Sequence, residues 1–352
     1  MSGSPAGSAI FSTISASPPD HSSAAPASPR RRCSRWPLGI GATTAIYSLV
    51  DQVILRALPV REPERLVLRC PTMLGGPSHT LAVVADLPSF RNPPVDEVVL
   101  GVQFAPLEGL LSPHFGLFWQ ESLRSDFPKV EEKPALEPQL EQLNELPRSP
   151  QPGLRLLEKM ETARVWFLSE TGNELVQLQP DRFHMNWRRR EKADKYPRYP
   201  YLRKRFEETA RKLVAFLERE ELGAFAPVQV EMTYVNAIKV ENSEAFAAME
   251  DFFSVWTKPV EIPGVSLEMS HFGLTARIVD GKETIGRLRV TAAPATSTLH
   301  GPNFKMDLTA RGLPLGSGSD GVMAFLDRAH SVIVQTFDSI TTKGKHEMWG
   351  KS

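Results

Sequence analysis

The stretch Asn92-Pro-Pro-Val-Asp-Glu-Val-Val-Leu-Gly-Val-Gln-Phe104 decides how the rest of the chain is interpreted. Its two prolines favour an extended entry, and from Val98 to Phe104 every second residue is apolar. A period of two places these side chains on one face of a β-strand, so we expect that face to be buried. Pro106 and Gly109 then end the strand. We therefore expect the folded body to begin near residue 86, just before this stretch.

Composition excludes several classes of protein. The chain has 352 residues, and its 41 basic side chains balance its 41 acidic ones, so net charge gives no argument for nucleic acid or a membrane. Both cysteines, Cys33 and Cys70, precede the opening strand, which leaves residues 86–352 without a disulfide framework or a thiolate zinc site. No run of about 18 apolar residues occurs. We expect a cytoplasmic protein with no cofactor, no metal and no membrane partner.

Residues 1–85 differ from the rest. As far as Pro29 the chain is mostly Ser, Ala, Pro and Gly, which predicts disorder. Residues 38–68, beginning Leu38-Gly-Ile-Gly-Ala-Thr-Thr-Ala-Ile-Tyr-Ser-Leu-Val50, resemble a fragment of macrolide-exporter-type ABC transporter permeases. The rest of a permease is missing, so we interpret residues 1–83 as a fusion scar or the product of a misplaced start codon. Val84 is the alternative start that we expect, because Val can be encoded by GTG, which is a common alternative start codon in bacteria.

The first half of the body, residues 86–225, reads as β-α-β-β-α. A helix should begin at Ser112, which is followed by Pro at the next position, and should bury Phe115, Trp119 and Leu123. Residues 129–152 are acidic and proline-rich, which predicts a solvated loop. Residues 165–168 and 175–178 form a hairpin around Gly172-Asn173, residues 183–187 extend its second arm, and an amphipathic helix from Leu202 ends at Gly223.

The second half, residues 226–352, repeats this order as β-α-β-β-β-α. The expected elements are a strand over residues 228–234, a helix capped by Ser243 that runs to Trp256, strands over 265–278, 284–293 and 304–310, and a final helix over 322–340. Asp280-Gly281 is a hairpin turn. The sequence thus predicts an α+β fold in which one or two antiparallel sheets carry helices on one face, built from two similar halves by internal duplication.

The body also resembles a family of sporadically distributed bacterial and archaeal proteins of unknown function. The motifs that carry the resemblance are Pro93-Pro-Val-Asp-Glu-Val-Val99, Gly101-Val-Gln-Phe104, Phe127-Pro-Lys-Val-Glu-Glu132, Asn186-Trp-Arg188, Tyr196-Pro-Arg-Tyr199, and the ending from Leu326-Asp-Arg-Ala-His330 to Trp349-Gly350. The resemblance spans residues 86–352. It implies a shared fold unit and no particular chemistry.

One candidate site is the segment from Trp187 to Arg205, which holds nine basic and two acidic side chains with tyrosines between them. Guanidinium groups hold phosphates and aromatic rings stack on bases, so this composition favours a single-stranded nucleic acid or a nucleotide. The candidate ligand-binding residues are Trp187, Arg188, Tyr196, Arg198 and Tyr199. The alternative is a connecting loop whose charges pair with Glu131–Glu145.

A second candidate is the pair Asp327 and His330 on the final helix, with Trp349 near the end of the chain. A carboxylate three residues from a histidine on a helix can orient the ring as a general base, but no nucleophile accompanies them in the sequence. We interpret the chain as a binding protein for a phosphate-bearing ligand or nucleic acid. Two alternatives stay open: a structural or partner-binding subunit, and a hydrolase-like enzyme that uses Asp327 and His330.

Overall fold

The computed structural model describes residues 87–143, 145, 164–256 and 262–352, all within one compact unit. The expectations for residues 1–85, including the permease-like fragment and a start at Val84, lie outside the described residues. Residues 144 and 146–152 of the predicted acidic loop also lie outside the described residues.

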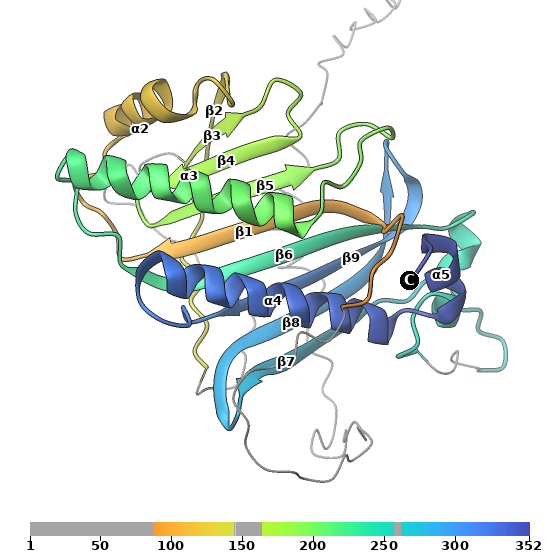
Figure 1. The fold of residues 1–352 in the computed structure, drawn as a ribbon. Helices are drawn as coiled ribbons and strands as arrows, with labels where there is room; N and C mark the ends of the chain where they lie inside the picture. The colour runs from red at the N-terminus through yellow and green to blue at the C-terminus, as the bar shows by residue number, and fades with distance from the viewer. Residues whose placement is uncertain (1–86, 144, 146–163, 257–261) are drawn as a thin grey trace, which may run out of the picture. The chain divides into compact units, whose positions relative to one another are not determined.

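The described residues form a single antiparallel sheet of nine strands (Figure 1). The opening strand β1, Val95–Phe104, lies inside the sheet between β5, Arg182–Arg188, and β6, Pro227–Lys239. The order is β2-β3-β4-β5-β1-β6-β9-β8-β7. The remaining strands are β2 (Lys129–Lys133), β3 (Arg164–Leu168), β4 (Glu174–Gln179), β7 (Phe272–Asp280), β8 (Glu283–Ser297) and β9 (Gly301–Gly312).

The helices lie on one face of the sheet, which confirms the predicted α+β class. In Figure 1, α3 (Tyr199–Arg219) and α4 (Gly318–Ile340) run side by side across this face. Two shorter helices, α2 (Ser112–Phe118) and α5 (Lys343–Trp349), complete the layer, and a π-helical turn, Trp119–Leu123, continues α2. Among the described residues no helix is long and apolar enough to cross a membrane.

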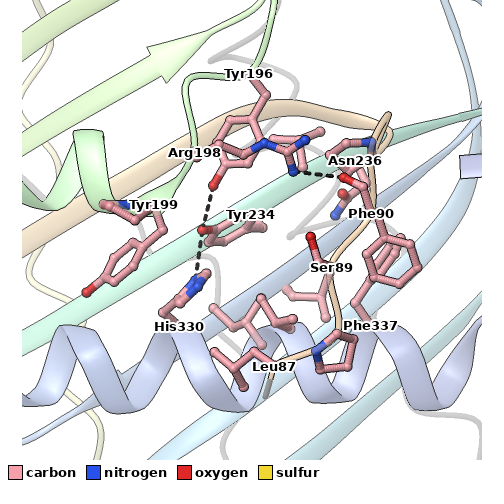
Figure 2. Close-up of a pocket in the computed structure, with 17 residues that line it drawn as sticks. Leu87, Ser89, Phe90, Tyr196, Arg198, Tyr199, Tyr234, Asn236, His330 and Phe337 are labelled. Atoms are coloured by element: carbon pink, nitrogen blue, oxygen red, sulfur yellow. Dashed lines mark hydrogen bonds between the residues drawn. The ribbon is translucent and has the colours of Figure 1, made fainter. Parts of the chain in front are cut away.

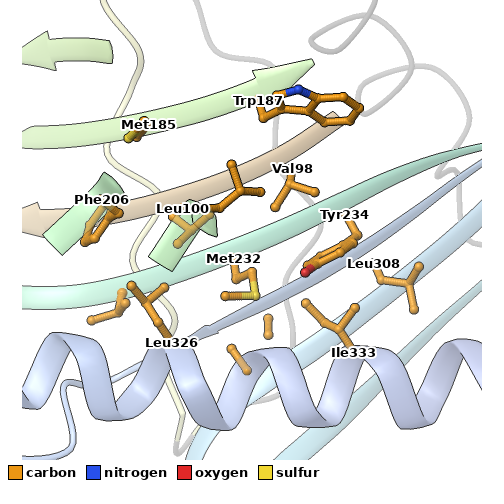
Figure 3. Packing of buried hydrophobic residues seen from close by; sticks show 14 of the residues in the cluster. Val98, Leu100, Met185, Trp187, Phe206, Met232, Tyr234, Leu308, Leu326 and Ile333 are labelled. Atoms are coloured by element: carbon orange, nitrogen blue, oxygen red, sulfur yellow. The ribbon is translucent and has the colours of Figure 1, made fainter. Parts of the chain in front are cut away.

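The core fills the space between the sheet and the helices (Figure 3). The predicted alternation in β1 is confirmed, since Val98, Leu100, Val102 and Phe104 are each at most 2% exposed. Leu326 and Ile333 of α4 face the same layer. The opposite side chains of the strands are mostly polar, and we call the surface that they form the polar face.

The two halves share a strand order. In each half the first strand borders the last one, because β1 pairs with β5 and β6 pairs with β9. The two first strands, β1 and β6, then join the halves at the centre of the sheet. Among the described residues the first half has one strand more than the second. This shared order agrees with the predicted pair of halves, and a common origin by duplication stays a prediction.

Several predicted elements of the first half need correction. Lys129–Lys133, expected in a loop, forms the edge strand β2 because its backbone pairs with β3 even though its side chains are largely exposed. Residues 182–188 do not extend the arm of the hairpin. They form a separate strand after a turn at Pro180-Asp181. Helix α3 ends at Arg219 rather than at Gly223.

In the second half the predicted helix over residues 243–256 is wrong. Two 3₁₀ turns, Ser243–Phe246 and Met249–Asp251, stand in its place, and Asn242 rather than Ser243 caps the first. The aromatic rings of this segment decide its path, because Phe246, Phe252 and Phe253 all pack on Phe304 with centroids 5.1 to 5.4 Å apart. Strand β7 begins at Phe272, seven residues later than predicted.

Candidate functional site: a pocket beside helix α4

A pocket of about 250 Å³ lies between the start of the described chain, strand β6 and helices α3 and α4 (Figure 2). Its walls are mostly apolar, and its polar side chains come from Ser89, Arg198, Asn236, His330 and three tyrosines. The full lining consists of Leu87, Pro88, Ser89, Phe90, Pro93, Val95, Tyr196, Arg198, Tyr199, Pro200, Tyr234, Asn236, Leu308, His330, Ile333, Val334 and Phe337.

A chain of hydrogen bonds crosses this pocket. The hydroxyl of Tyr196 lies 2.9 Å from that of Tyr234, which in turn lies 3.0 Å from Nδ1 of His330. Burial lowers the pKa of His330 to about 4, although the Asp327 charge acts in the opposite direction, so the ring is neutral at pH 7. Burial also raises the pKa of Tyr196 to about 12 and that of Tyr234 well above its usual value. The three groups are therefore neutral donors and acceptors.

Tyr199 ties the pocket to a charged group outside it. Its ring stacks on His330 with centroids 4.0 Å apart, and its hydroxyl donates to Oδ1 of Asp327 at 2.7 Å. Arg203 donates to both oxygens of the same carboxylate, at 2.8 and 3.0 Å. Asp327 thus joins α3 to α4 and forms no hydrogen bond with His330. The predicted orientation of His330 by Asp327 is wrong in this geometry, because Tyr199 and Arg203 take the carboxylate.

Arg198 holds the segment that closes one side of the pocket. Its Nη1 and Nη2 donate to the carbonyl oxygens of Phe90 and Arg91, each at 2.8 Å. The guanidinium also lies 5.7 Å from the centroid of the Tyr196 ring. The backbone of Arg198 has a φ of 77°, which costs a non-glycine residue about 1–3 kcal/mol and persists only where the surroundings impose it. Arg198 thus adopts this backbone conformation at the position from which its side chain holds Phe90 and Arg91.

The structure brings together members of both predicted sites and separates others. Tyr196, Arg198 and Tyr199 line one pocket with His330. Trp187 lies behind Tyr196, with ring centroids 5.5 Å apart. Trp349 packs on Phe90 and Phe337, which are themselves lining residues. Asp327 lies outside the lining and bonds to the hydroxyl of Tyr199. Arg188 is on the polar face, where its Nε donates to the carbonyl of Gly172 at 3.0 Å.

Most cations of the segment from Trp187 to Arg205 have partners of their own. Arg189 bonds to two backbone carbonyls, and Arg205 pairs with Asp126 and Glu174. The expected pairing with Glu131–Glu145 is mostly absent among the described residues, where Glu131 acts on Arg188 through space only. Glu141 instead pairs with Arg287 and Arg289 of β8, and its side chain is only 6% exposed. That part of the acidic stretch is therefore not a solvated loop.

Sequence reasoning missed Tyr234 and Asn236 of β6 as site residues. The sequence did contain a signal for them, because Tyr234 and Asn236 occupy positions at which the alternation of β6 predicts buried apolar side chains. A tyrosine and an amide on a buried strand face need polar partners, and such groups often line a cavity. The segment Leu87–Phe90 carried no comparable signal.

Two further observations bear on the site. Within the described ranges, no three His, Cys, Asp or Glu side chains are grouped so that they could hold a metal ion. No protein-family model, no curated protein and no solved structure matches this chain.

Proposed function

We propose that the body binds a small, mostly apolar molecule with one neutral or anionic polar group, in the pocket between Tyr196, Tyr234 and His330. The observation that supports this most is the hydrogen-bonded row of these three side chains at the wall of an otherwise apolar cavity. Apolar pockets with a few convergent polar groups are the usual form of small-molecule sites.

Size and charge narrow the class of ligand. At about 250 Å³ the cavity is somewhat below the roughly 300–1,000 Å³ of sites for drug-sized ligands, so the ligand is smaller, close to a single substituted ring. Arg198 is the charged side chain of the lining, and no carboxylate of the described residues lines the cavity with it. A cationic ligand would therefore meet a like charge without compensation, whereas a neutral or anionic group would not.

The geometry favours binding over hydrolysis. A hydrolytic histidine needs a nucleophile on one ring nitrogen and an orienting acceptor on the other. Here Nδ1 of His330 is occupied by Tyr234, and Asp327 is bonded to Tyr199 and Arg203. A hydrolase that uses Asp327 and His330 stays a prediction without support from these contacts.

The other expectations also stay predictions. Binding of a phosphate-bearing ligand or nucleic acid by the segment from Trp187 to Arg205 would have to use cations that mostly hold other partners. A partner-binding role would use the edge strands β2 and β7, and nothing in their contacts identifies a partner. A cytoplasmic location agrees with the absence of cysteine from residues 86–352.

The proposal is tested with three probes of similar shape and different charge: benzyl alcohol, benzoate and benzylamine. Saturation-transfer NMR on the full chain should detect the alcohol and benzoate with roughly millimolar Kd, as expected for ligands of this size, and should detect benzylamine weakly or not at all. Tyr234→Phe keeps the ring and removes one hydrogen bond, so it should weaken binding of benzyl alcohol about 2- to 10-fold. Tyr201→Phe is the matched control, because Tyr201 is 45% exposed and outside the pocket.

A blocking variant makes the result decisive. Val334 is half-buried in the lining, and Val334→Trp should fill the cavity and remove the signal of both ligands. Unchanged binding in Val334→Trp, or no signal from any of the three probes with the wild-type chain, would contradict the proposal.

A further inference from the structure

The polar face carries buried polar side chains in register across the sheet. Gln177 of β4 pairs with His184 of β5, and His184 pairs with Gly101 of β1. Beyond Gly101 the row continues through Glu231 of β6 to Arg311 of β9. All four side-chain-bearing positions on this row belong to polar residues, although their side chains are largely withdrawn from solvent. Such groups require partners, because an unpaired polar group loses its hydration without compensation.

A directed series of hydrogen bonds begins at Arg164, the first residue of β3. Nη1 of Arg164 and Nε1 of Trp166 both donate to Oε1 of Gln177 at 2.9 Å. The amide of Gln177 donates to Oδ1 of Asn186 at 2.7 Å, and Asn186 donates to Glu97 at 2.6 Å. The hydrogen bonds therefore fix the orientation of the side-chain amides of Gln177 and Asn186. Oε1 of Gln177 already accepts two hydrogen bonds, one from Nη1 of Arg164 and one from Trp166.

Arg164 lacks a negative partner among the described residues. Its side chain is only 4% exposed, and its Nε forms no hydrogen bond with any described residue. The neighbouring guanidinium groups do have carboxylates, since Arg182 pairs with Asp181 and Arg311 pairs with Glu231. The charged group that acts on Arg164 is Arg182, of the same sign, and burial together with this charge lowers the pKa of Arg164 to about 10. A buried charge is normally paired, because leaving it alone costs several kcal/mol.

Other cations gather at the same place around the ring of Trp166. Nζ of Lys133 lies 4.9 Å from the ring centroid, and the guanidinium carbons of Arg164 and Arg188 lie at 5.3 and 5.5 Å. Lys133 belongs to the edge strand β2, and its side chain is 27% exposed. Its Nζ pairs with Glu131 at 2.7 Å, and the Glu131 side chain is itself 45% exposed, so an anion at this cluster would share Lys133 with Glu131. The cluster therefore reaches solvent at Lys133, on this edge of the sheet, while Arg164 and Trp166 lie buried behind it.

We propose that Arg164, Lys133 and Arg188, grouped around Trp166, form a binding site for the oxyanion of a small molecule, either a phosphate or a carboxylate. The site is separate from the pocket beside α4, because none of these four residues lines that pocket. The anion supplies the missing charge for Arg164 and accepts the hydrogen bond from its free Nε. Arg188, which the sequence singled out for a phosphate, acts here on the polar face instead of beside Tyr196.

The test compares the thermal midpoint of the full chain in sodium phosphate, sodium sulfate, sodium succinate and sodium chloride, all at equal ionic strength and pH 7. Phosphate at 50 mM should raise the midpoint by roughly 3–6 °C above chloride if it binds with a Kd near 1 mM. A rise with phosphate and sulfate alone identifies a tetrahedral oxyanion. A larger rise with succinate identifies a carboxylate ligand. Either result supports the site.

The variant Arg164→Gln should lose the phosphate or succinate effect. In chloride it should be at least as stable as the wild type, because it removes a buried charge that no described carboxylate neutralises. Arg211→Gln is the matched control, since Arg211 is an arginine of α3 with a side chain 69% exposed, and it should keep the full effect. Equal effects of the anions in Arg164→Gln and in the wild type would overturn the proposal.

Isothermal titration of the wild-type chain with inorganic phosphate and with succinate gives a second readout that needs no variant. Absence of binding by both anions at 20 mM would also overturn the site, whatever the variant does. Failure here leaves the pocket beside α4 untouched, because its probes and its variants are different.

Discussion

At the centre of the polar face, Gly101 leaves room for the imidazole ring of His184. A Cβ at this position would lie 2.5 Å from Cδ2 and 2.8 Å from Nε2 of that ring. Non-bonded carbon atoms do not approach so closely, so any other residue at position 101 must move the ring. Burial meanwhile lowers the pKa of His184 to about 4, which keeps the ring neutral at pH 7 between Glu231 and three arginines.

We expect Gly101→Ala to lower the free energy of unfolding by about 1–3 kcal/mol, through overpacking against His184. Urea denaturation measures this change. Gly116→Ala is the control, because no atom lies within 4 Å of the added Cβ and an alanine in α2 should add about 0.5–1 kcal/mol.

A double variant identifies the cause of the Gly101 effect. In the presence of His184→Ala, the change Gly101→Ala should cost at least 1 kcal/mol less than it does alone. Full additivity of the two changes would show that the ring of His184 is not the obstacle.

At the scale of elements, aromatic side chains and one shared carboxylate hold the helix layer together. Phe118 of α2 packs against Phe216 of α3 with centroids 5.3 Å apart. Asp327 of α4 accepts hydrogen bonds from Tyr199 and Arg203 of α3. The pair Arg203–Asp327 is partly exposed, so its contribution is small, and burial of apolar side chains dominates the packing of the helices.

Phe118 is fully buried, and we expect Phe118→Ala to cost roughly 3–5 kcal/mol of unfolding free energy because it leaves a cavity between α2 and α3. Leu117→Ala on the same helix is the matched control, since Leu117 is 47% exposed and should change stability by less than about 0.5 kcal/mol. Chemical denaturation measures the unfolding free energy of both variants. Equal decreases for Phe118→Ala and Leu117→Ala would contradict this packing of α2.

On the scale of the whole molecule, the sheet separates two environments. The face beneath α3 and α4 is mostly apolar, with polar side chains gathered at the pocket that holds Tyr196, Tyr234 and His330, whereas the polar face holds amides, carboxylates and guanidinium groups. The two proposed sites lie on these different faces, so their ligands can be studied independently.

Every element of the sheet and of the helix layer described above lies after residue 86. A chain that begins at Asp86 should therefore unfold in one cooperative transition, with a midpoint within a few degrees of that of the full chain. Circular dichroism during heating measures both. Loss of the transition in the shorter chain would mean that residues before Asp86 contribute to the core.

The sequence by itself determined which side chains of each strand are buried. Alternation along a strand is a local property, so β1, β6 and β9 could be identified from the sequence. Each of these strands buries the face that its alternation predicts. Helical periodicity likewise predicted α3 and α4. Helical periodicity gave the wrong prediction at residues 243–256, where two 3₁₀ turns replace the expected helix. Buried apolar residues at spacings of three and four also occur in compact turns.

Only the tertiary structure decided which distant side chains meet. Tyr196 and His330 are 134 positions apart in the chain, and they share a pocket because β1 and β6 pair at the centre of the sheet and bring α3 beside α4. Arg188, which is close to Tyr196 in sequence, lies on the opposite face for a local reason: side chains alternate along β5, and Trp187 takes the core side. Composition can mark a segment as basic and aromatic. Which of its charges already have partners depends on contacts that no local pattern encodes.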